Sequence, residues 1–161
     1  MNFFDTPAGE AIITFLISMV PVIELRGAIP YAIAKDIAPW LAFCLAVVGN
    51  MLPVPFILLF IRKIFAWMKK YPRLGKIAYK LEARAQNKSG GVRKSELIGL
   101  CILVAIPLPG TGAWTGALVA ALMEMRLKRA LPTIFLGVLI AGVAVTLVVS
   151  LGIEALSWMA G

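Results

Sequence analysis

Histidine is absent from this 161-residue chain, cysteine occurs twice, and only 15% of the residues are charged. Cys44 and Cys101 lie within apolar stretches and form no CxxC motif, so we interpret them as small packing residues. Without histidine, clustered cysteines or a nucleophile beside a base, the sequence predicts no metal site, no cofactor and no catalytic residues. An enzyme is therefore not expected.

Hydrophobic residues make up 61% of the chain, and the mean hydropathy is +0.93. Soluble domains average roughly 45–50% apolar and about 25% charged residues. A soluble core in a chain of this length is too small to bury so much apolar surface. The composition predicts an all-α integral membrane protein, because helices satisfy their own backbone hydrogen bonds in lipid.

Four uncharged stretches differ in length. Residues 37–61 and 133–153 contain 25 and 21 residues, so each, as a helix, is long enough to cross a hydrocarbon core of about 30 Å. Residues 11–23 and 97–109 contain 13 each. As helices these measure roughly 20 Å, which is too short to cross.

Each short stretch runs into a segment with glycine and proline, "PVIELRGAIP" at 21–30 and "PLPGTGAWTG" at 107–116, and a second short apolar piece follows. Paired interrupted segments in two halves of a chain are the sequence pointer to a transporter binding site. We predict one membrane domain, residues 1–161, built as an inverted repeat of residues 5–61 and 97–161. Each unit is predicted to be a re-entrant helical hairpin plus a transmembrane helix. Four plain spanning helices with kinks are the alternative.

A basic linker, residues 62–96, joins the two units. It holds eleven Lys and Arg against two Glu, and its apolar residues recur at helical spacing. This predicts an amphipathic, cytoplasmic segment that contacts anionic lipid head groups. The segment "RLKR" at 126–129 lies on the same face only if the hairpins are re-entrant, which places both termini outside a bacterial inner membrane. Nucleic acid is not expected as a partner, because membrane segments tether the linker on both sides.

Broken helices at membrane depth expose backbone groups, which only protein or water can satisfy, so a polar cavity is predicted there. Half-helix N-termini in such a cavity favour anions, glycine permits close approach and threonine offers hydroxyls. The substrate- or ion-binding candidates are Glu24, Arg26, Asn50, Pro107, Pro109, Gly110, Thr111, Gly112, Trp114 and Thr115.

Glu24 and Arg26 are two residues apart in the first interrupted segment. A charge at mid-membrane costs roughly 2.5–3.5 kcal/mol on insertion scales, so such residues usually form pairs or line a pathway. One hypothesis makes Arg26 the phosphate binder and Glu24 the protonatable acid. The other makes them a structural ion pair. For Asn50 the alternatives are a hydrogen bond across helices and a place in the cavity wall.

The motifs "VPVIELRGAIP" at 20–30 and "PLPGTGAWTGALVA" at 107–120 resemble the small multidrug export protein family, a distant relative of the DedA superfamily. The resemblance implies two re-entrant hairpins in an inverted repeat, and proton-dependent transport of undecaprenyl phosphate. It assigns the charged motif of the first loop to Glu24 and Arg26. It assigns the second-loop motif to Pro107, Pro109, Gly110 and Gly112, although DedA proteins usually carry an acid beside this motif and an arginine after it.

Together these features predict a small secondary transporter for an anionic amphiphile, such as a polyprenyl phosphate carrier lipid, with possible proton coupling. Export of drug-like amphiphiles and a non-transporting membrane scaffold are the alternatives. A chain of 161 residues encloses little volume, so a homo-oligomer is expected, with a dimer favoured.

Overall fold

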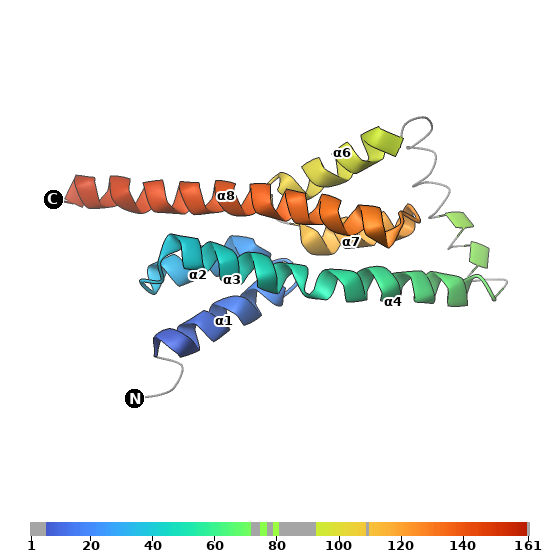
Figure 1. The fold of residues 1–161 in the computed structure, drawn as a ribbon, viewed down its shortest axis with the longest axis horizontal. Coiled ribbons are helices and arrows are strands. Elements are labelled where there is room, and N and C mark those ends of the chain that lie inside the picture. The colour runs from blue at the N-terminus through green and yellow to red at the C-terminus, as the bar shows by residue number, and fades with distance from the viewer. Residues whose placement is uncertain (1–5, 72–74, 77–78, 81–92, 109, 161) are drawn as a thin grey trace.

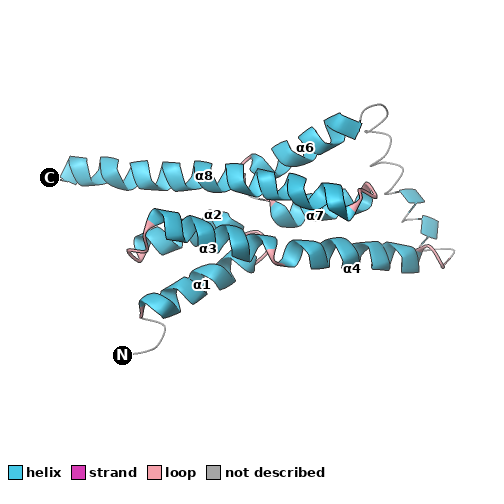
Figure 2. Ribbon diagram, in the orientation of Figure 1, coloured by secondary structure: helices cyan, strands magenta, loops and turns pink. Residues whose placement is uncertain are grey.

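A computed structural model of the chain describes residues 6–71, 75–76, 79–80, 93–108 and 110–160. All regular structure in these ranges is helical, in agreement with the predicted all-α class (Figure 2). The helices are α1 (Pro7–Met19), α2 (Glu24–Ala34), α3 (Pro39–Met51), α4 (Pro53–Met68), α6 (Arg93–Ala105), α7 (Ala113–Leu122) and α8 (Leu127–Ala160).

Two long helical rods run in opposite directions along the molecule (Figure 1). One is α8, and the other is α3 followed by α4, which Leu52 interrupts. The shorter helices form two pairs: α1 packs against α2 and α3, and α7 packs between α4, α6 and α8. The first pair lies toward the end of the molecule where α8 finishes, and the second toward the end where α4 finishes (Figure 1).

The long rods match the two stretches predicted to cross a membrane. Pro39–Met68 and Leu127–Ile153 are 30 and 27 residues long, with mean hydropathies of 2.3 and 2.7. Only about a third of each apolar window is buried inside the chain. Large side chains such as Phe60 and Val148 are 65% and 72% exposed. Because long apolar helices with exposed faces are stable in lipid and not in water, the fold is that of a membrane protein.

The helix breaks lie close to their predicted positions, with one correction. The first break is a turn at 20–23, so the charged and proline residues of "PVIELRGAIP" follow it: Glu24 begins α2, and Pro30 lies inside that helix. Val22 adopts a φ of +75° in the turn, which is rare for a β-branched residue. The second break, residues 106–112, coincides with the predicted PLPGTG segment. Conformational strain at the first turn is thus borne by Val22 and by Glu24, whose φ is +49°, and not by a glycine.

The helices α2 and α7 end in the same way. In each, the N–H of the third residue after the helix end donates to a carbonyl five residues earlier. The two bonds are Ile37 to Ala32 and Met125 to Ala120, both at 3.0 Å. The residue before each donor is acidic and has a positive φ, of 59° and 54°. This is a Schellman ending with an apolar residue after it, and both apolar residues are buried. The chain then starts a long rod in each case.

Both edges of the predicted linker are helical in the structure. The helix α4 continues to Met68, seven residues beyond Ile61, and α6 begins at Arg93. About half of the predicted amphipathic segment at 62–96 lies outside the described residues.

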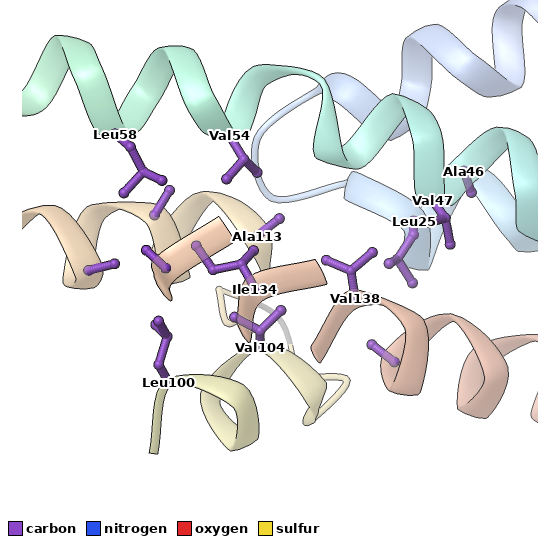
Figure 3. Packing of buried hydrophobic residues seen from close by; sticks show 14 of the residues in the cluster. Leu25, Ala46, Val47, Val54, Leu58, Leu100, Val104, Ala113, Ile134 and Val138 are labelled. Carbon is purple, nitrogen blue, oxygen red and sulfur yellow. The ribbon is translucent and has the colours of Figure 1, made fainter. Parts of the chain in front are cut away.

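The apolar core forms where α2, α3, α4, α6, α7 and α8 meet (Figure 3). Leu25, Leu58 and Ile134 are each at most 1% exposed there. Small residues bring the helices close together: a Cβ added at Gly137 would lie 2.7 Å from the Cβ of Val104. Without a hydrophobic driving force in lipid, this close packing is a principal source of helix association. The core fixes how the two pairs of short helices face each other.

Candidate functional site

The two helix breaks lie next to each other near the middle of the molecule (Figure 1). Residues 20–23 separate α1 from α2, and residues 106–112 separate α6 from α7. Hydrogen bonds join the two regions across 80 to 95 positions of sequence. We call this set of contacts, made by Glu24, Arg26, Thr111 and Trp114, the inter-turn network.

Glu24 is buried, with 3% of its surface exposed. Its carboxylate Oε2 lies 3.1 Å from Nη1 of Arg26, and Oε1 accepts the backbone N–H of Trp114 at 3.1 Å. Trp114 is the second residue of α7, whose first N–H groups have no partner within the helix. The charge of Glu24 therefore caps the positive end of a helix from the other half of the chain.

Arg26 reaches the same region with both terminal nitrogens. Nη1 also donates to the carbonyl of Thr111, and Nη2 donates to the Ile106 carbonyl at 2.9 Å and to Thr111 Oγ1 at 3.2 Å. Its Nε is buried and has no partner among the described residues. The guanidinium thus satisfies two carbonyls of the second turn, Ile106 directly after α6 and Thr111 shortly before α7. The predicted anion-binding group is occupied by the chain itself in this conformation.

Trp114 links the same turn to the first helix. Its indole N–H donates to the carbonyl of Met19 at 3.2 Å, and Met19 is the last residue of α1. The threonine hydroxyls act locally: Thr111 Oγ1 lies 2.8 Å from the Ile106 carbonyl, and Thr115 Oγ1 donates to the Gly110 carbonyl at 2.8 Å. These side chains shape the second turn and complete the broken helix ends.

The two glycines of the second turn have different surroundings. Gly112 has a φ of +151°, and a Cβ added there would overlap the carboxylate of Glu24 and lie 2.6 Å from Nη1 of Arg26. Gly110 has a φ of +82° and open space around the same position. The missing side chain of Gly112 therefore leaves the space that the Glu24–Arg26 ion pair occupies. Gly110 is required only for the backbone conformation of the turn. Pro107 lies in this turn, and Pro109 lies outside the described residues.

Asn50 is fully buried near the end of α3. Its side chain lies near the Glu24 carboxylate. Neither the amide nitrogen nor the amide oxygen of Asn50 has a hydrogen-bond partner among the described residues. An unpaired buried amide costs about 1–3 kcal/mol. Of the two alternatives for Asn50, a hydrogen bond across helices is not formed in this conformation.

The structure thus brings Glu24, Arg26, Thr111, Gly112 and Trp114 together, with Asn50 alongside. Sequence reasoning missed the acceptors, which are backbone carbonyls of Met19, Ile106 and Thr111. No side-chain pattern marks a carbonyl as a partner, so no sequence signal would have found them.

Comparison with known proteins agrees with the motifs. The family model described as "Putative small multi-drug export protein" matches residues 24–144, a range that includes both halves of the inter-turn network. No curated protein and no solved structure matches the chain. Since the match covers most of the 161 residues, the chain belongs to this family of small export proteins.

Proposed function

We propose that the chain is a small bacterial inner-membrane secondary transporter that moves an anionic amphiphile, with a polyprenyl phosphate carrier lipid as the substrate and protons as the coupling ion. One observation carries the proposal. A buried acid and a largely buried base lie where two broken helices meet, and they hold the two halves of the chain together. Charged residues at this depth in a membrane protein mark substrate pathways and proton relays.

The proposed topology is an inverted repeat of two re-entrant hairpins, α1–α2 and α6–α7, each followed by a spanning rod. Glu10 in α1 lies 3.6 Å from Lys35 at the end of α2, so both ends of the first hairpin are at one side. Lys69 beyond α4 lies 3.2 Å from Glu124 beyond α7. The second hairpin therefore ends near the start of the basic linker. This supports a common face for the linker and the basic segment at 126–129, as the positive-inside rule predicts.

The spacing of the elements supports the repeat. The helices α1 and α6 begin 86 residues apart and also end 86 residues apart. The helices α2 and α7 end 88 residues apart, and α3 and α8 begin 88 residues apart. The second turn is three residues longer than the first and α7 is one residue shorter than α2, which together give the change of two. The helices α2 and α7 also share Schellman endings. Two halves that were similar only in hydropathy would not be expected to share this backbone feature, so it supports the repeat.

Reporter fusions test this topology. A reporter after Asn87 is expected on the cytoplasmic face, and one after Gly161 on the outer face, because only one rod separates them if the second hairpin is re-entrant. The measurement uses a paired alkaline phosphatase and fluorescent protein at each position, which are active on opposite faces. Both fusions on the cytoplasmic face would mean two full crossings and would refute the inverted repeat.

The proposed coupling follows from the contacts of Glu24. An ionised Glu24 accepts from Trp114 and pairs with Arg26, so it holds the turns together. Protonation removes the charge that both partners use, which weakens the inter-turn network and releases the guanidinium. A phosphate then has a bidentate donor available. The proton thus takes the place of Arg26 at Glu24, and the phosphate takes the place of Glu24 at Arg26. Binding of either ligand therefore favours binding of the other, which is the requirement for coupled transport.

Glu24→Gln tests the coupling. Glutamine keeps the volume and can accept the Trp114 N–H, but it cannot bind and release a proton. In proteoliposomes, movement of polyprenyl phosphate driven by a pH gradient is expected to fall to the level of protein-free vesicles. Glu10→Gln, in the half-exposed pair with Lys35, is the matched control and is expected to retain transport. Full gradient-driven transport by the Glu24→Gln protein would refute proton coupling through this residue.

Export of drug-like amphiphiles is the second candidate, because the family description names multi-drug export. The same vesicles loaded with a cationic dye distinguish the two substrates.

We further propose that the transporter is a homodimer and that its basic linker contacts anionic lipid head groups.

A further inference from the structure

Asn50 carries two buried polar atoms that the inter-turn network leaves unpaired. It is fully buried near the end of α3, and neither its amide nitrogen nor its amide oxygen has a hydrogen-bond partner among the described residues. The other fully buried polar side chains there, Thr14 and Ser18, each donate to a carbonyl of their own helix. Because a buried polar group without a partner is costly, the Asn50 amide is expected to have a partner in another state of the chain.

The packing of α2 against α3 places Asn50 beside Glu24. Leu25 and Val47, one from each helix, lie in the same core cluster (Figure 3). Glu24 directly precedes Leu25. Asn50 follows Val47 by three residues, so it lies on the same face of α3. The Asn50 side chain lies near the Glu24 carboxylate, and the two groups are neighbours across the contact between the helices.

The groups around the Glu24 carboxyl are donors, with one exception. The backbone N–H groups of Ala113 and Trp114 and the guanidinium of Arg26 lie there. They suit an ionised carboxylate, which only accepts hydrogen bonds, whereas a protonated carboxyl has an O–H that needs an acceptor. Among the side chains that the described structure places at Glu24, Asn50 is the one with a free acceptor, its Oδ1.

The Asn50 amide suits either form of the acid. Its nitrogen donates and its oxygen accepts, and neither atom is held by another group in the described structure. Arg26, on the same helix as Glu24, is the one charged side chain that acts on the carboxyl among the described residues. The packed helices α1, α3, α7 and α8 add no charge there, so the partner of a neutral Glu24 is a neutral group.

We propose that Asn50 is the hydrogen-bond partner of protonated Glu24. The carboxylate takes up a proton from water, its new O–H donates to Asn50 Oδ1, and Arg26 keeps its charge and is released. Asn50 is thus a positioning residue, because its bond stabilises the neutral acid and offsets the loss of the ion pair. The inference rests on the proposed proton coupling and holds for any anion that the chain carries.

Infrared spectroscopy of the full chain in phosphatidylcholine vesicles tests this bond. The carbonyl stretch of a protonated carboxyl lies at lower frequency when the group is hydrogen-bonded. Acidification is expected to produce a band at the frequency of a hydrogen-bonded acid, and this band is expected to be missing from the Glu24→Gln protein. No such band over the pH range in which the chain stays folded, or a band at the frequency of a free acid, would overturn the proposal without any Asn50 variant.

Asn50→Leu removes both amide groups at nearly the same side-chain volume. The Glu24 band is expected to move to higher frequency. The ratio of protonated to ionised Glu24 at a given pH is expected to fall about fivefold, the effect of losing one hydrogen bond. Thr14→Val is the matched control, because Thr14 is fully buried and its hydroxyl donates to the Glu10 carbonyl within α1. It is expected to leave the band and the ratio unchanged.

Thermal unfolding distinguishes this role from a purely structural one. Asn50 has no partner while Glu24 is ionised, so Asn50→Leu is not expected to lower the Tm at alkaline pH. The bond exists only below the pH at which Glu24 takes up its proton, so the Tm is expected to fall there. An equal fall at both pH values, or a Glu24 band that Asn50→Leu leaves in place, would refute the proposal.

Gradient-driven transport by the parent protein is measured separately. A Glu24 band that responds to Asn50→Leu, in a chain whose parent does not transport, would refute the proposed function and support the Asn50 bond. Transport by a parent whose band does not respond to Asn50→Leu would refute the Asn50 bond alone.

Discussion

Arg26→Met is expected to lower the free energy of unfolding by roughly 3–5 kcal/mol, because it leaves the Glu24 carboxylate buried without its counter-charge. Glu24 is 3% exposed, and the Arg26 side chain is 13% exposed, so water compensates little. The substitution also removes the donors to the carbonyls of Ile106 and Thr111. The measurement is an unfolding titration in mixed detergent micelles, with helix content as the signal.

The double variant Glu24→Leu with Arg26→Met separates structure from function. Removing both charges eliminates the unpaired ion, so the double variant is expected to recover most of the stability lost by either single variant. Transport is expected to be absent from all three proteins. Additive losses of stability would show that the two side chains act independently. A double variant that transports as well as the parent would show that the pair is a structural connection only and would refute its proposed role in transport.

Gly112→Ala is expected to abolish transport and to destabilise the chain more than Gly110→Ala does. Both substitutions force a Cβ onto a residue with positive φ, at a cost of about 1–2 kcal/mol. At Gly112 the new methyl also overlaps the Glu24 carboxylate, which adds about 1–3 kcal/mol as an overpacked site. The ion pair must move to accommodate it. The measurements are the same unfolding titration and transport of polyprenyl phosphate in vesicles.

Gly110→Ala is the matched control, because it has the same backbone requirement and open space around its Cβ position. It is expected to retain transport. Equal losses of stability and transport at the two positions would mean that only the backbone conformation of the turn is required. The contact between Gly112 and the ion pair would then have no separate effect.

Helix class and helix breaks were accessible from local sequence. Uncharged runs of 25 and 21 residues identify the two rods, because membrane thickness sets a minimum length that can be counted along the chain. Glycine and proline mark the second break for a similarly local reason. The first break was located less well: Pro30 is accommodated inside α2, and the turn is made by 20–23 with Val22 at positive φ. Tertiary packing overrides local preference there.

The charged pair was visible in the sequence, but its partners were not. The sequence showed Glu24 and Arg26 only as charged neighbours, because side chains two residues apart do not face each other on a regular helix. In the structure they meet at the first turn of α2, where Glu24 has a φ of +49°. Only the tertiary structure showed that they form hydrogen bonds with Trp114 and Thr111, 85 or more positions away. It also showed that the pair occupies the space beside Gly112. Those partners are backbone N–H and C=O groups, which every residue carries, so no residue type identifies them. Contacts of that kind arise only when packing brings two broken helices together.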